Sequence, residues 1–447
     1  MLHDVIIIGA GYSGLAAARS LNKAAKNILL LEARDRVGGR IHTHYLPDGN
    51  YVDLGGQWIG PGQNRMYELA AQYNINTFPT FYKGKSTLLH NDKLKNYKGI
   101  IPPLPLFALL SLNNAIQKIT KLSRKVDLSK SWNSLNAVMY DRISLADWMQ
   151  QQMKNETARE MFTVAAEAIF GTDTADISFL HALFYIRSNN NFEYLMNIRK
   201  GAQQDRIMGG AQSICIKIAE ELGERLMLNH AVSNIQQSTD TVMLNGDNFS
   251  YTAKKIIIAL PPPVAARINY TPPLPIKRSR LMNDYFMGNV IKCYGIYPKP
   301  FWRERKLNGL CAAPGNSVSV TFDNSPYDGS KGIFMGFVLG EKAKQLVALT
   351  EEERKRIVLE NFGRLLGIEA LAPEFYIDKS FSNEPWSMGC YAGMMPVNAI
   401  TNNATALSEP TGNIHWAGTE TSGLFNGYME GAVRSGERAA AEILNSL

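Results

Sequence analysis

Cysteine is scarce in this chain, with only four among 447 residues. Cys215, Cys293, Cys311 and Cys390 stand far apart and form neither a CxxC pair nor the spacing of a zinc site. The sequence therefore predicts no disulfide framework and no bound metal. Separated thiols fit a reducing compartment, so we expect a cytoplasmic protein.

Long apolar runs are also missing. No stretch reaches the roughly 20 residues that a membrane-spanning helix requires. The N-terminus lacks the features of a secretory leader, and residues 436–444 form a polar, helix-like end. From these absences we expect no transmembrane anchor.

The excess of one charge sign is small. There are 47 Lys and Arg residues against 40 Asp and Glu residues, a net charge of +7 spread along the chain. Nucleic-acid-binding domains concentrate basic residues, so this balance predicts no nucleic-acid partner and favours an anionic ligand only weakly. Hydrophobic residues make up 45% of the chain. That content excludes a disordered or fibrous protein, and the length predicts two or three domains.

The strongest local pattern lies at the N-terminus. The β-branched run Val5–Ile8 predicts a buried strand, 15–21 a helix, and Ile28–Leu31 a second strand. A GxGxxG motif at 9–14 joins the first strand to the helix, and Glu32 ends the second strand. Strand, motif, helix, strand and acid in this order predict a dinucleotide-binding unit.

Each residue of the motif has a chemical reason. Gly9 permits a tight turn, Gly11 lets the backbone approach a pyrophosphate, and Gly14 allows helix and strand to pack closely. The helix N-terminus offers free N–H groups to the anion. Glu32 can accept hydrogen bonds from a ribose diol.

A second glycine pair indicates which dinucleotide is bound. Gly38, Gly39 and Arg40 follow Glu32, and Arg40 offers a two-pronged donor to phosphate. NAD-binding folds have no need of this element. It resembles the motif of FAD-dependent amine oxidases and their relatives, so FAD is preferred over NAD.

The middle of the chain changes in character. Residues 79–199 show helical periodicity and predict an inserted helical region, with helices at 115–122, 145–153, 158–169 and 179–186. Its most apolar stretch, 99–112, contains three prolines and is expected as a loop packed on the core or as an exposed lip at a substrate entrance or membrane surface. Further helices are expected at 211–222 and 351–367, and strands at 225–229, 232–236, 241–244, 254–260, 289–297 and 333–339.

Five separated motifs resemble the flavin-dependent monoamine oxidases. They are 53–61, 288–293, Trp386–Tyr391, 417–421 and 427–432, and together they cover essentially the whole chain in the family's order. The resemblance implies an α/β fold in which a Rossmann-like FAD-binding domain of the glutathione-reductase type is interleaved with an α+β substrate domain having a mixed sheet. The expected FAD-binding domain comprises 1–78, 204–288 and 385–447, and the substrate domain comprises 79–203 and 289–384.

The resemblance also implies which residues contact FAD. Besides the three motif glycines, they are Ser13, Glu32, Arg34, Gly39, Arg40, Gly56, Gln57, Val232, Gly418, Glu420 and Met429. Glu420 and Met429 are expected near the flavin ring and ribityl chain. Cys390 occupies the position where mitochondrial members bond covalently to the flavin, whereas several bacterial relatives hold FAD non-covalently, so both modes stay open.

The implied catalytic residues are Tyr391, Tyr428 and Lys292. Two tyrosine rings in front of the flavin would orient an amine, because their π faces favour partial positive charge on its nitrogen. Lys292, flanked by apolar residues, is an unusual charge to bury, and in the family it assists the reaction with oxygen. The implied substrate chamber comprises Trp58, Ala168, Ile169, Met196, Gln203, Val320 and Phe337.

These residues predict an oxidase that converts primary arylalkylamines and oxygen into aldehyde, ammonia and hydrogen peroxide. An L-amino-acid or polyamine oxidase on the same fold is the nearest alternative, and a non-catalytic flavin-binding protein is an alternative of another class. The sequence leaves open whether the protein forms a homodimer.

Overall fold

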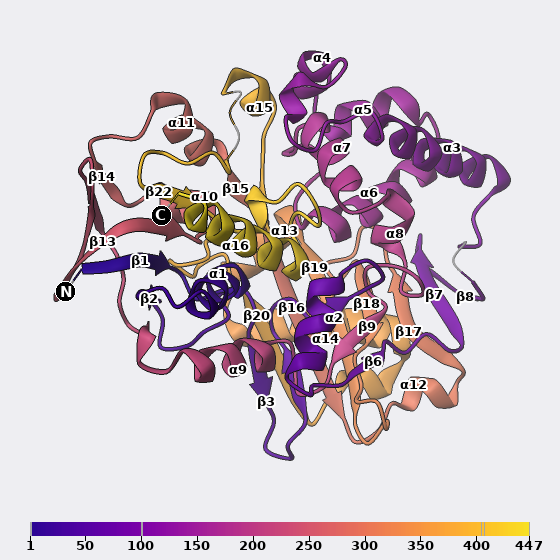
Figure 1. The fold of residues 1–447 in the computed structure, drawn as a ribbon. Helices are drawn as coiled ribbons and strands as arrows, with labels where there is room; N and C mark the ends of the chain where they lie inside the picture. Colours follow the sequence, from indigo (N-terminus) through magenta and orange to yellow (C-terminus); the bar gives the residue numbers. More distant parts are fainter. Residues whose placement is uncertain (1, 100–101, 404, 406, 447) are drawn as a thin grey trace.

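Two large sheets form the frame of the molecule, and a group of helices stands to one side of them (Figure 1). The structure, a computed structural model, describes residues 2–99, 102–403, 405 and 407–446. One sheet is largely parallel and carries the N-terminal motif, while the other is largely antiparallel. The predicted class, α/β with a Rossmann-like unit and a second mixed sheet, is confirmed.

The first sheet contains eight strands in the order β10–β2–β1–β13–β12–β11–β14, and β22 pairs with β13. Their bounds are β1 (Leu2–Ile8), β2 (Ile28–Leu31), β10 (Leu226–Met227), β11 (Asn234–Gln237), β12 (Val242–Gly246), β13 (Phe249–Ile258), β14 (Asn269–Thr271) and β22 (Ile414–Trp416). The pairs of β1 with β2 and β13, and of β13 with β22, are parallel, whereas β12 is antiparallel to both its neighbours. Each strand expected here overlaps an observed one.

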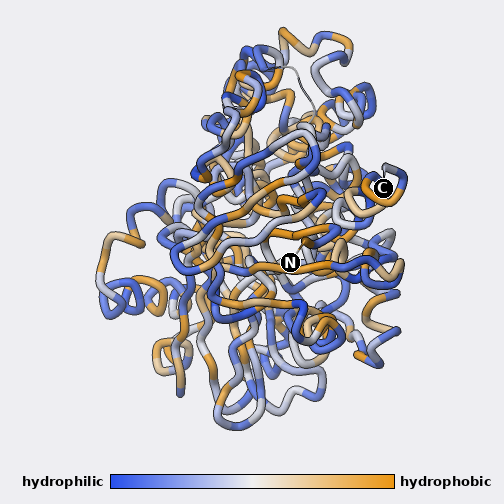
Figure 2. The backbone as a smooth tube through the Cα atoms, turned by 60° about the vertical axis from the view of Figure 1, so that its left-hand side comes forward, coloured by the Kyte–Doolittle hydropathy of each residue, from blue (hydrophilic) through white to orange (hydrophobic). Residues whose placement is uncertain are grey.

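Burial on both faces explains why the C-terminal ends of β1 and β13 read as continuous apolar runs. Ile6 and Ile7 of β1 are fully buried and pair with Ile256 and Ile257 of β13. Apolar strands of this kind lie in orange at the centre of Figure 2, surrounded by more hydrophilic helices and loops. The core of this unit therefore lies on both sides of its parallel strands.

Glycines let two helices approach this sheet closely. Helices α1 (Tyr12–Lys23) and α16 (Met429–Leu444) pack against each other. A Cβ atom at Gly14 would stand 1.8 Å from the carbonyl oxygen of Gly9, and one at Gly436 would stand 2.0 Å from that of Ser13. A side chain at either position would push α1 away from β1 or α16.

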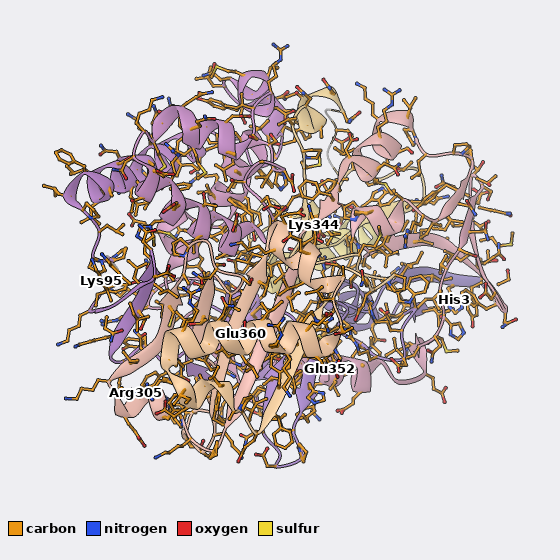
Figure 3. The ribbon with its side chains drawn as sticks, turned by 180° about the vertical axis from the view of Figure 1, so that it is seen from behind. His3, Lys95, Arg305, Lys344, Glu352 and Glu360 are labelled. Atoms are coloured by element: carbon orange, nitrogen blue, oxygen red, sulfur yellow. The ribbon has the colours of Figure 1, made fainter. Side chains whose placement is uncertain are left out.

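The second sheet has the order β20–β16–β19–β18–β17–β7–β8. Its strands are β7 (Lys85–His90), β8 (Lys93–Tyr97), β16 (Val290–Tyr297), β17 (Leu307–Ala312), β18 (Val320–Asp323), β19 (Gly332–Leu339) and β20 (Phe375–Ser380). One of its faces packs against α13 (Gly340–Val347) and α14 (Glu351–Leu366). Glu352 and Glu360 of α14 point outward in Figure 3, whereas Val358 and Leu359 are buried.

Six helices form the region to the right in Figure 1, drawn in purple to magenta. They are α3 (Leu106–Ser123), α4 (Ala137–Asp141), α5 (Leu145–Gln152), α6 (Glu156–Phe170), α7 (Phe179–Ser188) and α8 (Phe192–Met196). Each helix expected in this region overlaps one of them. The inserted helical region predicted from periodicity is therefore confirmed.

The apolar segment 99–112 is corrected by the structure. Residues 100 and 101 lie outside the described residues, but helix α3 begins at Leu106, so the expected loop is wrong from there on. Pro105 takes the N-cap position, where a missing N–H group costs no intrahelical hydrogen bond. Phe107 is 79% exposed, whereas its neighbour Ala108 is fully buried in the core, so one side of this segment is exposed and the other packs on the core.

Shorter elements complete the chain. The helices are α2 (Asn64–Gln72), α9 (Gln212–Leu222), α10 (Pro262–Ala265), α11 (Ile276–Asp284), α12 (Phe301–Glu304) and α15 (Ala399–Asn402). The strands are β3 (Thr43–Tyr45), β4 (Tyr51–Asp53), β5 (Trp58–Ile59), β6 (Thr77–Pro79), β9 (Asp205–Ile207), β15 (Phe286–Met287) and β21 (Gly393–Met394). Among the described residues, none of the helices combines the length and apolar character needed to cross a bilayer.

The strand order suggests how the chain divides. The first sheet takes its strands from 2–31, 226–271 and 414–416, and the second takes its strands from 85–97 and 290–380. We therefore propose the interleaved division stated above, with 1–78, 204–288 and 385–447 in one domain and 79–203 and 289–384 in the other.

We expect Gly14→Ala to destabilise the protein. The added methyl group meets the carbonyl of Gly9, and overpacking of this kind costs about 1–3 kcal/mol. Urea unfolding followed by circular dichroism measures the change. Ser20→Ala on the same helix, which removes only a hydroxyl bonded to the Ala16 carbonyl, is the control. Equal stability of the two variants would contradict the close packing.

Candidate active site

A cavity of about 1280 Å³ runs from the carboxyl ends of the parallel strands to the second sheet and the helical region. Gly9, Glu32, Leu260 and Gly418, which follow β1, β2, β13 and β22, all line it. Pockets for one small molecule usually enclose about 300–1,000 Å³. The cavity therefore has room for a dinucleotide and a second ligand at the edge where ligands bind in such sheets.

The glycine motif forms a cradle at one end of the cavity. Gly9 has φ +99°, a conformation that L side chains rarely adopt. A Cβ atom at Gly11 would have only the carbonyl oxygen of Gly38 within 4 Å, at 3.8 Å, so a side chain there would enter the cavity. Gly11 also caps α1 without a side-chain hydrogen bond. The backbone is thus bare where a pyrophosphate would approach.

Glu32 is oriented by the backbone around this cradle. Its carboxylate accepts hydrogen bonds from the N–H groups of Ala10, at 2.7 Å, and Arg34, at 3.0 Å. It is buried yet lines the cavity. Glu32 can therefore accept hydrogen bonds from a ribose diol, and together with the cradle it fits a dinucleotide such as FAD.

Arg40 and Glu420 form a buried ion pair. The Arg40 guanidinium donates to both carboxylate oxygens, at 2.6 and 3.2 Å, and to the carbonyl of Tyr391 at 3.0 Å. The N–H group of Gly393 also donates to Glu420, at 3.0 Å. Although burial favours the neutral acid, Arg40 holds the pKa of Glu420 below its ordinary value.

Two predicted cofactor residues do not line the cavity. Gly14 contacts the Gly9 carbonyl instead, as its packing role requires. Glu420 does not line the cavity itself, but it is bonded to Arg40, which does. Its expected place near the flavin ring and ribityl chain stays a prediction.

Ser13 and Arg34 line the cavity but have protein partners. The Ser13 hydroxyl accepts the N–H group of Gly418 at 2.8 Å. Arg34 donates to Glu384 at 3.1 Å and to Ser387 at 2.6 Å. These bonds join the N-terminal motif to the C-terminal segments at the same edge of the sheet. The predicted contacts of Ser13 and Arg34 with FAD stay predictions.

Strand register brings Lys292 into the chamber. In the second sheet Lys292 lies opposite Phe337, which lies opposite Val320. Directly opposed residues point to the same face of a sheet. All three line the cavity, although the sequence separates them by up to 45 positions (337 − 292).

The Lys292 ammonium is surrounded by acceptors. It donates to the carbonyls of Asp53, at 2.6 Å, and Gly55, at 2.8 Å, and to Oε1 of Gln57 at 2.7 Å. Burial lowers the pKa of Lys292 to about 7, against the opposing attraction of Asp53. Lys292 can therefore exchange its proton near neutral pH.

Tyr391 and Tyr428 both line the chamber and are held by other aromatic rings. Tyr391 meets Phe337 edge to face, with centroids 6.0 Å apart, and Tyr428 lies 6.4 Å from Tyr185. Burial raises the pKa of both phenols well above the ordinary value, so they are neutral at physiological pH. Neutral rings present π faces to a ligand without adding charge.

All seven residues predicted for the substrate chamber line the cavity. Trp58 packs against Phe322 with centroids 4.8 Å apart and lies 6.1 Å from Phe337. The acidic residues among the described lining are Glu32 and Asp247, and both adjoin the dinucleotide end of the cavity. The chamber walls are thus mainly aromatic and aliphatic.

The sequence did not reveal two polar residues that adjoin Lys292 and its partner Gln57, namely Asp53 and Asn324. Asp53 is fully buried, and its carbonyl also accepts the hydroxyl of Tyr294 at 2.6 Å. Asn324 accepts the amide of Gln57 at 2.9 Å. Asp53 stands inside one of the five motifs, but only its contacts reveal this position.

A dinucleotide cradle that opens into an apolar chamber is the architecture of an oxidoreductase, in which a redox cofactor meets an organic substrate away from water. Comparison with known proteins narrows that class. The chain belongs to the family described as flavin containing amine oxidoreductase, which it matches over residues 12–444.

Relatives extend along the whole chain. A Dictyostelium discoideum protein named "Probable flavin-containing monoamine oxidase A" is 36% identical over 449 residues, covering 100% of this chain and 98% of that one. Wild-type putrescine oxidase bound to putrescine aligns with a TM-score of 0.95 and 30% identity, covering 100% and 99% of the two chains. Cyclohexylamine oxidase from Brevibacterium oxydans IH-35A gives the same four values. This chain is therefore a flavin-dependent amine oxidase that uses FAD, an amine and oxygen.

We expect Glu420→Gln to lower the free energy of unfolding by about 3 kcal/mol, because it leaves the buried charge of Arg40 unpaired. Urea unfolding of the holoenzyme measures the loss. Glu437→Gln is the matched control: Glu437 pairs with Arg65 at 3.1 Å, but both side chains are 39% exposed, so the expected loss is below about 1 kcal/mol. Equal losses would show that burial does not strengthen the Arg40–Glu420 pair.

Proposed function

We propose that this enzyme oxidises primary arylalkylamines, with the overall reaction R–CH2–NH2 + O2 + H2O → R–CHO + NH3 + H2O2. The observation that carries the proposal is the chamber between Tyr391, Tyr428 and Lys292. The chamber walls suit an aromatic or aliphatic group on the amine. The acidic residues that line the cavity lie at its dinucleotide end, away from this chamber. Relatives named monoamine oxidase and cyclohexylamine oxidase support an amine with a single nitrogen.

The proposed roles of the residues follow from their places in the cavity. Tyr391 and Tyr428 confine the amine between their rings and orient its α-carbon. When bound, FAD would supply the two-electron acceptor for the amine. Lys292 lines the chamber and has an exchangeable proton, so it can stabilise the negative charge that oxygen acquires on reduction.

The proposed cofactor contacts include a group for the pyrophosphate and a group for a ribose. The cradle of Gly9 and Gly11 faces the pyrophosphate, and Glu32 faces a ribose. The remaining proposed contacts line the same cavity: Arg34, Gly39, Arg40, Gly56, Gln57, Val232, Gly418 and Met429.

A diamine oxidase is the second candidate, because putrescine oxidase is among the similar structures. Putrescine carries a second ammonium group, which needs a partner when it is buried. Among the described residues of the chamber no carboxylate offers one, and Arg199 contributes a further positive charge to the lining. The chamber therefore favours amines with one cationic group.

An amine panel tests the proposal. On anaerobic mixing, we expect phenethylamine, benzylamine and tyramine to bleach the visible absorbance of the bound flavin. Putrescine should do so at least about a hundredfold less efficiently, because burying an unpaired ammonium costs several kcal/mol. Dithionite, which reduces accessible flavin without an amine site, is the control. Flavin that responds to dithionite but to none of the arylalkylamines would refute the proposal.

We also propose that Cys390 carries the flavin covalently. Its side chain is half-buried and lines the cavity beside Tyr391. Burial raises the pKa of the Cys390 thiol to about 12, although Arg40 and Lys292 act in the opposite direction. Those two cations are the groups that would favour the thiolate required for bond formation.

Acid precipitation tests the covalent bond. We expect a yellow precipitate from the wild-type protein and a colourless one from Cys390→Ala. Cys215→Ala, which removes a thiol buried in the core behind α1, should precipitate yellow like the wild type. A colourless wild-type precipitate would show that the flavin is bound non-covalently.

A further inference from the structure

Asp53, which does not line the cavity, contacts Lys292 and makes more polar contacts than a residue with only a packing role. The main-chain carbonyl of Asp53 accepts both the Lys292 ammonium and the Tyr294 hydroxyl, each at 2.6 Å. Its side chain is fully buried. One residue at the end of β4, a strand of the small β3–β4 sheet, therefore orders two polar groups of β16.

The Asp53 carboxylate accepts hydrogen bonds that favour its charged form, although burial raises its pKa above the ordinary value. Oδ1 accepts the Thr43 hydroxyl at 2.6 Å and the N–H group of Ala211 at 3.0 Å. Oδ2 has no hydrogen-bond partner among the described residues. A buried carboxylate with one bare oxygen is costly unless a cation compensates it. Lys292 and Arg206 are the cations that act on it.

The number of donors favours a charged lysine. Three acceptors surround Nζ, namely the carbonyls of Asp53 and Gly55 and Oε1 of Gln57. An ammonium supplies three N–H donors, whereas a neutral amine supplies two. Losing the proton would therefore remove one of these three hydrogen bonds.

We propose that Asp53 is a positioning residue for Lys292: its carbonyl orients the ammonium and its buried carboxylate supplies the balancing negative charge. This inference rests on the proposed function of Lys292 in the oxygen reaction. Asp53 itself does not line the cavity. It acts only through the lysine.

Other charged and titratable groups surround this pair and bear on its pH response. Arg206 on β9 opposes the charge of Lys292, and Cys390 opposes the effect of Arg206. Lys379, opposite Lys292 on β20, is paired with Glu384. The tyrosines near Asp53 are all neutral phenols with raised pKa values: Tyr12, Tyr45, Tyr51 and Tyr294.

The sign of the expected effect follows from these charges. Burial lowers the pKa of Lys292 to about 7, and the attraction of Asp53 opposes that decrease. Removing the negative charge removes the attraction. In Asp53→Asn the lysine should lose its proton about one pH unit lower, since an opposite charge nearby shifts a pKa by about 1–3 units.

The first test observes Lys292 itself in the holoenzyme. Lysine labelled with 13C at Cε gives signals that titrate with ionisation, and the signal absent from Lys292→Met is that of Lys292. We expect its midpoint to fall by about one pH unit in Asp53→Asn. Asp141→Asn is the matched control, because Asp141 is an equally buried carboxylate whose hydrogen-bond donors among the described residues are the uncharged Ser178 and Thr401.

The second test follows oxygen. The rate constant for reoxidation of the reduced enzyme should begin to fall about one pH unit lower in Asp53→Asn than in the wild type. In the Lys292→Met background, Asp53→Asn should add nothing, because Asp53 acts through the lysine. If Asp53→Asn does not fold, Thr43→Val removes a donor that stabilises the carboxylate and should shift the midpoint in the same direction by less.

The outcomes separate the two proposals. An unchanged Lys292 midpoint in the Asp53 and Thr43 variants would overturn the role of Asp53, whatever the oxygen kinetics show. An additional effect of Asp53→Asn without Lys292 would overturn it too. A shifted midpoint with unaltered oxygen kinetics would uphold the charge balance and instead refute the proposed function of Lys292.

Discussion

The buried pair of Arg40 and Glu420 is the interaction on which the rest of the site depends. Arg40 follows the nucleotide motif at the N-terminus, Glu420 belongs to the C-terminal segment, and the same guanidinium binds the carbonyl of Tyr391. One ion pair thus links the cofactor cradle, the strand β22 edge and the aromatic wall. Because a buried charge is costly without its partner, each segment constrains the position of the others.

A second constraint acts where the two sheets meet. The carboxyl ends of the parallel strands present backbone and polar groups, while the antiparallel sheet presents a face of large apolar residues interrupted by Lys292. Apolar walls exclude water and strengthen the electrostatic effect of that one ammonium. The same burial brings its pKa near neutrality, so acid–base behaviour and packing at this position have one cause.

Local patterns predicted a substantial part of this fold. The nucleotide unit was predictable because its glycines, helix and acid lie within 24 consecutive positions (32 − 9 + 1) and act on one another through the chain. The helical region was predictable because burial on one side of a helix leaves a 3.6-residue period. The start of α3 at Leu106 was not, since three prolines conceal a helix that begins directly after the last of them.

The amino-acid sequence by itself determined the class of cofactor and, through family motifs, predicted Lys292, Tyr391 and Tyr428 as candidate catalytic residues. Tertiary structure alone decided where these residues lie and which groups surround them. Strand register placed Lys292 opposite Phe337 and on the same sheet face as Val320, Arg40 came to pair with Glu420, and the Asp53 carbonyl came to accept the lysine ammonium. The physical reason is that burial, hydrogen-bond satisfaction and charge compensation are properties of neighbours in space, and these neighbours are as far as 380 positions apart (420 − 40) in the chain.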